Sequence, residues 1–413
     1  MDDISEREYL GAERNMKRIY KYRLYPTNSQ EENLNETLNT CRILYNNSLA
    51  ERRDAWKNEH KSINYYEQKH NLVEAKKDNP YLPKVHSQVL QDVVLRLDKS
   101  FVNFFRRVKK GEKKVGYPRF KKYGRFKSFN YPQYGNGVEL NNGRLNLSKI
   151  GNIKMKLHRE MPNDGVIKSC IIKKDVDKWY ACFIVETERK TIKPAPIRTV
   201  VGIDMGLNDL ITLSDGNKIK PPKYLRQSED KIKKHQRRVS RKKKGSKNNR
   251  RSVIKLEKVH RKVRNQRLDF NHKLSRNLVN KFDLIAYEDL KIRNIVKNHY
   301  LAKSISDASW GTLNRLIVYK AEEAGKLSVE VNPNGTSQEC HRCRKIHDMP
   351  LSKRTIECDC GNRMDRDLNA SINILKRGLI KIGWGTAEST HMETQPLHQN
   401  TQNVFDASRV VEV

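Results

Sequence analysis

The chain has 413 residues, with 84 Lys or Arg against 48 Asp or Glu and a formal net charge of +36. This excess indicates a polyanionic partner, and it favours nucleic acid over an anionic membrane. The length suffices for two or three domains. Because the chain has no run of about 18 apolar residues and no apolar leader, we expect a cytoplasmic protein without a membrane span.

The N-terminal region is predicted to contain one strand followed by one long helix. Residues 1–15 are polar and are expected to form a disordered extension. Alternating basic and apolar side chains over residues 17–26 predict a half-buried strand with a basic face. Thr27 or Asn28 is a suitable cap for the next helix, whose apolar side continues towards Trp56.

A second helix is predicted from about Ser87 to Val108, after a Lys-rich and loosely patterned stretch over residues 57–84. Gln88 and Gln91 lie on this helix, and amide side chains pair well with adenine edges, although most such glutamines simply face solvent. Its packed face is predicted to consist of Val89, Leu90, Val93, Val94, Leu97, Phe101, Phe104 and Phe105.

Residues 115–134 interleave aromatic and basic side chains, which is typical of a nucleic-acid-binding strand and also of an ordinary sheet edge with lysines on its wet face. Short apolar runs then recur up to Thr187 between Gly and Asn turns, and this spacing predicts a small antiparallel barrel. Pro194 and Pro196 mark a linker. The basic side chains that we expect to meet phosphates are Arg119, Lys121, Lys122, Arg125 and Lys127.

The organising stretch of the chain is residues 199–216, TVVGIDMGLNDLITLSDG. Its first apolar run predicts a buried strand that carries Asp204, and residues 210–213 predict an antiparallel partner. An ionised carboxylate is costly to bury unless it is paired or holds a metal. GIDMG also resembles the first phosphate loop of the actin and sugar-kinase group, but Leu207 and Asn208 replace the Gly-Thr or Gly-Ser that normally follows.

Two later segments also place an acid at the edge of an apolar element. Residues 284–290 predict a strand ending at Glu288, and residues 364–375 predict a helix that begins near Asp367 and carries Leu368, Ile372 and Leu375 on one face. Separately, each acid is more often a solvated loop residue or a helix cap. Together, Asp204, Glu288 and Asp367 supply the oxygen ligands that divalent cations require for phosphodiester cleavage.

The most basic segment is residues 223–267, with 20 Lys or Arg and 3 acids, a net charge of +17. A charge run usually forms a solvated face, but this density requires an anionic partner. We predict two long helices joined around residues 245–249 and lying along a nucleic-acid duplex. The residues expected to neutralise phosphates there are Lys242, Lys243, Lys244, Arg250 and Arg251.

A helix over residues 305–324 and a strand over residues 327–331 are predicted after Glu288. Four of the seven cysteines lie between this strand and the helix of Asp367. Thiolates at this spacing suit a structural, tetrahedral Zn²⁺. The second pair has one intervening residue instead of two, so His341, His347 or Asp359 are alternative ligands. The predicted ligands are Cys340, Cys343, Cys358 and Cys360. Residues 383–413 are expected to form a flexible tail.

GIDMG, YEDL, the four cysteines and DRDLNAS, in this order, resemble the RuvC-like nuclease half of the TnpB/OrfB family of transposon-encoded proteins, relatives of the miniature type V CRISPR nucleases. The resemblance spans roughly residues 16–385. It assigns the three acidic positions to Asp204, Glu288 and Asp367, and it makes Asp289 and Asp365 neighbours without this role.

The resemblance implies an α/β fold with an RNase H-like (RuvC) nuclease domain, interrupted by a zinc ribbon and preceded by an N-terminal β-barrel (wedge) with a helical recognition insertion. The implied domains are the wedge at 16–28 and 126–196, the recognition helices at 29–125, the nuclease domain at 197–336 and 363–382, and the ribbon at 337–362. In the family, the recognition module contacts the DNA motif beside the target.

The implied function is an RNA-guided DNA endonuclease that cuts next to a short flanking motif, with two catalytic Mg²⁺ and one structural Zn²⁺. Its expected partners are a guide RNA and double-stranded DNA, bound by a monomer. Three alternatives stay open: a CRISPR-associated type V effector, a nuclease-inactive RNA-guided repressor, and a transposase that joins DNA ends directly.

Overall fold

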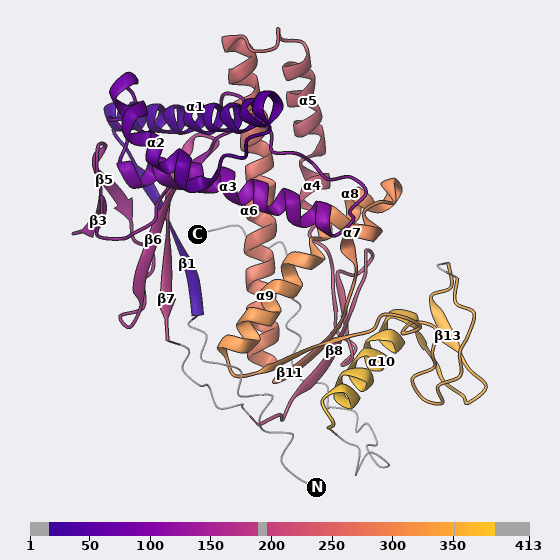
Figure 1. The fold of residues 1–413 in the computed structure, drawn as a ribbon. Helices are drawn as coiled ribbons and strands as arrows, with labels where there is room; N and C mark the ends of the chain where they lie inside the picture. The colour runs from indigo at the N-terminus through magenta and orange to yellow at the C-terminus, as the bar shows by residue number, and fades with distance from the viewer. Residues whose placement is uncertain (1–15, 189–195, 351, 385–413) are drawn as a thin grey trace. The chain divides into compact units, whose positions relative to one another are not determined.

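The structure is a computed structural model, and it describes residues 16–188, 196–350 and 352–384 (Figure 1). The chain divides into two compact units at about residue 190. The expected N-terminal extension, most of the linker and the expected tail after residue 384 lie outside the described residues. Within the described part, no helix is both long enough and apolar enough to span a lipid bilayer.

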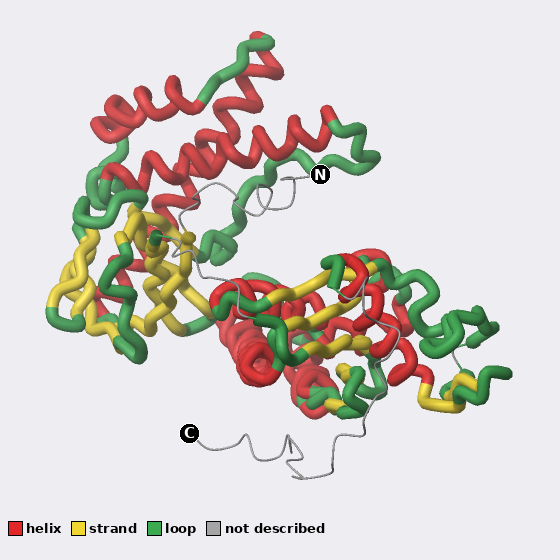
Figure 2. Tube along the Cα trace, turned by 90° about the horizontal axis from the view of Figure 1, so that it is seen from below, coloured by secondary structure: helices red, strands yellow, loops and turns green. Residues whose placement is uncertain are grey.

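The N-terminal unit combines a curved antiparallel sheet with three helices. Its strands occur in the order β2-β6-β7-β1-β5-β4-β3 and form a near-closed barrel, which confirms the expected barrel (Figure 2). The strands are β1 (Met16–Tyr25), β2 (Ser128–Tyr131), β3 (Val138–Asn141), β4 (Arg144–Leu147), β5 (Gly151–Lys156), β6 (Val166–Asp175) and β7 (Lys178–Thr187). The helices are α1 (Asn28–Glu59), α2 (Tyr65–Asp78) and α3 (Ser87–Lys109). Barrel and helices share one apolar core.

Local capping explains where α1 and α2 begin. Thr27 caps α1 in a reciprocal box with Gln30, as expected. Helix α2 was not predicted, because its apolar side chains are few. Its start is nevertheless encoded by Asn64, whose side chain accepts hydrogen bonds from the backbone N–H groups of Tyr66 and Glu67.

Two expectations for the N-terminal unit are wrong. The aromatic–basic stretch over residues 115–134 forms a strand only in β2, because its earlier residues have no strand partner. The packed face of α3 ends earlier than expected: Leu97 is fully buried, but Phe105 is 60% exposed. The last turns of α3 extend past the core, so apolar residues continue at helical spacing beyond the point where they are buried.

The C-terminal unit is built on a five-stranded sheet in the order β10-β9-β8-β11-β12. Strand β11 pairs in parallel with β8 and with β12, whereas β9 pairs antiparallel with β8, as expected. The strands are β8 (Val200–Met205), β9 (Ile211–Leu213), β10 (Lys218–Ile219), β11 (Leu284–Glu288) and β12 (Leu327–Val331). A small hairpin of β13 (Thr355–Glu357) and β14 (Arg363–Asp365) follows.

Helices cover both faces of this sheet. On one face, α6 (Lys247–Lys281) and α9 (Trp310–Glu323) pack with Val201, Ile203 and Ile285. On the other face, α10 (Arg366–Lys381) packs with Leu284 and Ala286. This arrangement confirms the mixed α/β, RuvC-like fold expected from the sequence.

The remaining helices of the C-terminal unit are α4 (Tyr224–Gln227), α5 (Glu229–Ser240), α7 (Ile292–Ile295) and α8 (His299–Ala308). Helices α5 and α6 pack together and are joined near Gly245, so the predicted basic helix pair is present. The single helix expected over residues 305–324 is instead two. Ser309 adopts a left-handed conformation with φ 51°, which ends α8 and redirects the chain into α9.

Candidate functional site: three carboxylates and a four-cysteine cluster

Strand alternation places two of the predicted acids on the same face of the sheet. Along β8, Val201 and Ile203 pack in the core formed with α6 and α9, so Gly202 and Asp204 face the α10 side. Along β11, Ala286 packs in the α10-side core, and Glu288 follows it by two residues. The parallel register aligns Gly202 with Ala286, which makes Asp204 and Glu288 level on adjacent strands.

Helix α10 brings the third acid to this face, and it does so by lying directly against the strand backbone. A Cβ atom on Gly202 would lie 2.0 Å from the carbonyl oxygen of Ser371, and one on Gly378 would lie 2.6 Å from the Ala286 Cβ. Only small residues allow this approach. Asp367 lies one helical turn before Ser371, in the first turn of the helix.

The helix face that packs on the sheet includes Leu375 of the predicted face, but its buried centre is made of other, mostly smaller side chains. Ala370, Ser371, Ile374 and Gly378 are buried, whereas Leu368, Ile372 and Leu375 are only partly buried. A close helix–strand approach selects small side chains, and hydrophobic periodicity does not detect them.

The other two acids act electrostatically on Asp204. Burial, together with the negative charges of Glu288 and Asp367, raises the pKa of Asp204 to about 8. Burial also raises the pKa of Glu288, against opposing effects of a hydrogen bond from Thr336 and the charge of Arg377. A divalent cation would relieve this concentration of negative charge, and oxygen ligands suit Mg²⁺. The residues present therefore fit the expected cation.

The two neighbouring acids have other partners. Asp365 is the N-cap of α10, and its Oδ1 accepts hydrogen bonds of 3.0 Å from the backbone N–H groups of Asp367 and Leu368. Its other oxygen lies 2.9 Å from the Lys218 ammonium. These contacts lower the pKa of Asp365 even though burial opposes them. Asp289 is exposed.

A buried hydrogen-bond network, which the sequence analysis did not identify, connects the acids to the cysteine segment. The Thr336 hydroxyl donates to Glu288 Oε1 at 2.6 Å. The Asn373 side chain donates to the carbonyl oxygens of Thr336 at 2.9 Å and Glu339 at 2.7 Å. Asn369 donates to the Glu339 carbonyl at 2.7 Å and accepts from the His341 backbone N–H at 2.9 Å.

Asn369 and Asn373 are both buried and lie four residues apart on α10, so their side chains share one face of the helix. The signal for them in the sequence was two amides at helical spacing within DRDLNASIN. Because the same helix carries Asp367, the backbone on either side of Cys340 is held to the element that positions the third acid.

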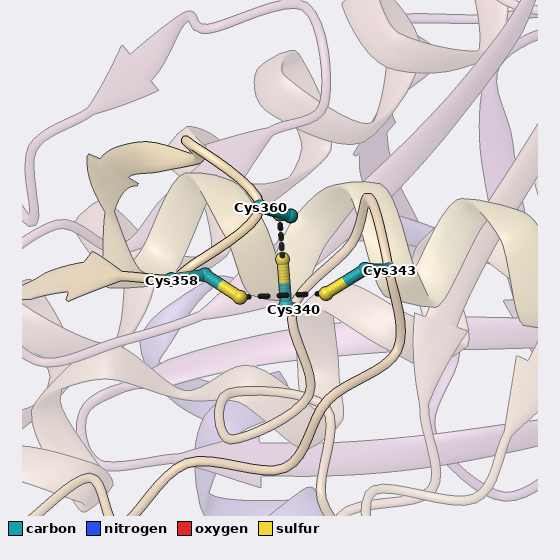
Figure 3. Close-up of side chains that lie close together, drawn as sticks. All are labelled: Cys340, Cys343, Cys358 and Cys360. Carbon is teal, nitrogen blue, oxygen red and sulfur yellow. Dashed lines mark hydrogen bonds between the residues drawn. The ribbon is translucent and has the colours of Figure 1, made fainter.

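The four predicted cysteines converge, although the second pair has only one intervening residue (Figure 3). Their sulfur atoms all lie within 4.8 Å of one another, with 3.7 Å between Cys340 and Cys360 and 3.3 Å between Cys343 and Cys358. A tetrahedral Zn²⁺ with Zn–S bonds of 2.3 Å requires sulfur separations of about 3.8 Å. The cluster therefore fits structural zinc.

The alternative ligands are not needed for this cluster. The His341 ring lies 3.3 Å from the Asn362 side chain, and Asp359 pairs with Lys345. Burial disfavours ionisation of Cys340, but backbone N–H groups of Cys343 and Arg342 hydrogen-bond its sulfur and lower its pKa to about 6. A thiolate at neutral pH is the form that binds a metal.

The residues expected to contact nucleic acid are mostly exposed. Arg119, Lys122, Arg125 and Lys127 are exposed in the segment before β2, and Lys121 is partly buried. On the α5–α6 helix pair, all five predicted cations, Lys242, Lys243, Lys244, Arg250 and Arg251, are exposed. Gln88 and Gln91 are partly buried, and the Gln88 amide donates to the Gln133 side chain at 2.6 Å.

A RuvC-like mixed sheet with helices on both faces, together with a four-cysteine cluster, defines the class of the protein as a RuvC-type domain with a zinc ribbon. Three family descriptions match: "Probable transposase" over residues 182–299, "Cas12f1-like, TNB domain" over 310–374 and "Helix-turn-helix domain" over 16–61. In the last range the structure has strand β1 and the long helix α1.

The chain belongs to the TnpB/OrfB family of IS605-type elements. It is 36% identical to a "Putative RNA-guided DNA endonuclease" of Streptomyces pristinaespiralis, with 90% of this chain and 91% of that protein covered. It is 30% identical to "Putative RNA-guided DNA endonuclease InsQ" of Escherichia coli strain K12, with 95% and 100% covered.

Among solved structures, a Cas12f1 chain in a complex with a single guide RNA and target DNA matches with a TM-score of 0.53. The match covers 87% of this chain and 98% of that chain at 12% identity. At this identity the likeness shows the shared fold.

Metal analysis tests the cysteine cluster. We expect about one Zn²⁺ per chain, lost when Cys340 and Cys343 are both replaced by Ser, because two thiolate ligands are removed. Replacing the buried Cys41 by Ser is the control that keeps the cluster and its zinc. Because metal binding is linked to local folding, loss of zinc should also increase hydrogen exchange around residues 336–341. A zinc-free wild-type protein with four titratable thiols in the cluster would contradict this prediction.

The raised pKa of Asp204 predicts a pH-dependent stability effect. The pKa of Asp204 in the folded protein, about 8, lies above the ordinary value of 3.8 for an aspartic acid, so the folded state binds one extra proton between these pH values. Because Asp204 loses its proton only in the unfolded chain over this range, the free energy of unfolding falls as pH rises from about 4 to 8. Without added divalent cation, Asp204→Asn should raise the unfolding temperature at pH 8 by about 2 °C or more, and by less at pH 5.

Added Mg²⁺ should reduce this difference, because it stabilises the wild-type carboxylate and not the amide. Asp289→Asn is the matched control, since Asp289 is exposed. An equal change in unfolding temperature for Asp204→Asn at pH 5 and pH 8 would show that the pKa of Asp204 is not raised in the folded protein.

Proposed function

We propose that the protein is an RNA-guided, Mg²⁺-dependent DNA endonuclease of a transposable element, which cuts target DNA beside a short flanking motif. The observation that carries the proposal is that Asp204 and Glu288 lie level on adjacent strands, on the face of the sheet that is covered by α10, the helix of Asp367. The names of the two relatives that match almost the whole chain support the RNA-guided part.

Asp204, Glu288 and Asp367 would hold the catalytic cations. When bound, two such cations activate water and stabilise the leaving oxygen of a phosphodiester. The protein's own contribution is positioning: Asp204 must lose its proton, Thr336 holds Glu288 by a 2.6 Å hydrogen bond, and the Asp365 cap secures the first turn of the helix that carries Asp367. Arg366 contacts Asp367 at 3.4 Å and balances part of the negative charge.

The charge distribution supports a guide RNA over a bare transposase. A transposase that binds one duplex needs only a moderate number of phosphate-neutralising side chains. Here the α5–α6 helix pair and its flanks alone carry the net +17 of residues 223–267, in addition to the basic segment before β2. An RNA scaffold, a heteroduplex and a DNA duplex together account for this excess.

A transposase and a nuclease-inactive repressor are the alternatives from other classes. The presence of all three acids disfavours the repressor. A CRISPR-associated effector would share the site and the mechanism, and the neighbouring DNA distinguishes it: a repeat array indicates an effector, and transposon ends indicate a transposable element.

Single substitutions test the assignment of the acids. Asp204→Ala, Glu288→Ala and Asp367→Ala should each reduce cleavage at least about 100-fold, because each removes a cation ligand. Nucleic-acid binding should remain, since the net charge of +36 hardly changes. Asp289→Ala is the matched control and should retain most activity, whereas Asp365→Ala should cost far less than the other three changes because it removes only the cap of α10. Full cleavage by Asp367→Ala would mean that the third acid is assigned wrongly.

Purification at moderate salt tests the guide RNA. We expect a bound RNA to accompany the protein and cleavage to follow the variable segment of that RNA. Replacing Lys242, Lys243, Lys244, Arg250 and Arg251 by Gln should weaken RNA binding and flatten the dependence of log affinity on log salt by about 4, if all five contact phosphates. Zinc content should stay the same. If RNA-free protein cuts a defined DNA site equally well, the transposase alternative gains and the RNA-guided proposal fails.

A further inference from the structure

The C-terminal end of α3 and the loop after it expose a cluster of four aromatic rings, defined here as the α3 aromatic cluster: Phe101, Phe104, Phe105 and Tyr117. Ring centroids of Phe104 and Phe105 lie 5.2 Å apart, and Tyr117 lies edge-on to Phe104 at 5.4 Å and to Phe101 at 5.5 Å. The rings therefore form one contiguous surface.

Much of this surface faces solvent. Phe105 is 60% exposed, and Val102 and Val108, three residues before and after it on the same helix face, are 59% and 49% exposed. Tyr117 is 44% exposed. These side chains are not required for the core, since the buried part of α3 ends at Leu97. An exposed apolar patch of this kind marks an interaction surface.

The cluster is held in place by polar contacts at its edges. The Arg107 guanidinium donates to the Gly116 carbonyl at 3.2 Å, which ties the loop carrying Tyr117 to α3. The Arg52 guanidinium lies 5.2 Å from the Phe101 ring centroid and donates to Asp98 at 3.0 Å. A preorganised aromatic surface loses little conformational entropy on binding.

The positive charge around the cluster indicates which kind of partner it can bind. Residues 106–127 contain 11 Lys or Arg and one acid, Glu112, so their net charge is 11 − 1 = +10. A second copy of the chain would bring an equal positive charge against this segment, which is repulsive. A partner with both negative charge and flat apolar faces fits, and single-stranded nucleic acid has both in its phosphates and its unpaired bases.

We propose that the α3 aromatic cluster is a stacking platform for an unpaired base of single-stranded nucleic acid, with Phe105 as the principal contact. The lysines and arginines over residues 106–127 hold the flanking phosphates. The stacking contact is additional to the phosphate contacts proposed above, and it rests on the proposed function only in requiring a nucleic-acid partner.

Binding measurements without cleavage test the platform. Full-length protein is freed of RNA by nuclease treatment and a high-salt wash, and kept without divalent cation. Fluorescein-labelled single strands of about 20 nucleotides, one of RNA and one of DNA, are titrated beside a DNA duplex of the same length. Phe105→Ala should weaken single-strand binding by about tenfold and leave duplex binding unchanged, because stacking needs an unpaired base.

Two further variants separate stacking from apolar contact. Phe105→Trp keeps a π face and should restore single-strand affinity, whereas Phe105→Leu keeps apolar area and should bind as weakly as the Ala variant. The salt dependence should not change in any of the three, because no charge is removed. Comparison of the RNA and DNA titrations shows whether single-stranded RNA or single-stranded DNA occupies the site. Since cleavage is not measured, a negative result leaves the nuclease proposal standing.

Two results would overturn the platform. One is wild-type single-strand affinity in Phe105→Leu, which would show that a π face is not used. The other is a concentration-dependent dimer of the wild-type chain, measured by light scattering, that no longer forms in Phe105→Leu. That result would show that the surface binds a second copy of the chain. Unchanged thermal unfolding of Phe105→Ala, expected for a side chain that is 60% exposed, confirms that the variants are folded.

Discussion

The site depends on one packing constraint: α10 lies directly against the backbones of β8 and β11. Gly202 allows this on β8, since a side chain there would overlap the backbone at Ser371, and Gly378 on the helix allows it opposite Ala286. Each strand carries its acid two residues after the small position, so Asp204 and Glu288 share the face that α10 covers. The small residues thus allow α10 to lie close to the strands, and the same packing places the helix of Asp367 over the face that carries Asp204 and Glu288. A methyl group at Gly202 would separate the layers and spread the carboxylates apart.

The cysteine cluster is connected to α10 by hydrogen bonds. Asn369 and Asn373 of α10 bind backbone groups on both sides of Cys340, and Thr336 in the preceding turn binds Glu288. Buried amides and hydroxyls are costly to leave without partners, so the network favours one arrangement of the segment. The segment that carries Cys340 is therefore hydrogen-bonded both to α10 and, through Thr336, to Glu288.

The chain uses its charge in two different ways. On the α5–α6 helix pair the cations are exposed with few aromatic neighbours, a surface that suits phosphates and carries no base information. At the end of α3 the cations surround exposed rings, which suits bases as well as phosphates. The acids, by contrast, are partly or fully buried, and burial, followed by the charges of Glu288 and Asp367, raises the pKa of Asp204.

The sequence by itself determined the chemistry and the local elements. The acid-bearing strands β8 and β11, the capped start of α1, the basic helix pair and the four cysteines follow from periodicity, caps and ligand spacing, and these are short-range properties that a linear pattern contains. Only the tertiary structure decided which helix face packs on the sheet, where α3 leaves the core, that Ser309 divides one predicted helix, and that Thr336, Asn369 and Asn373 connect the ribbon to the acids. The physical reason is that these features depend on contacts between residues far apart in the chain. A small residue that permits a close approach, an amide that satisfies a distant carbonyl and a phenylalanine that lies beyond the core have no periodic signature of their own.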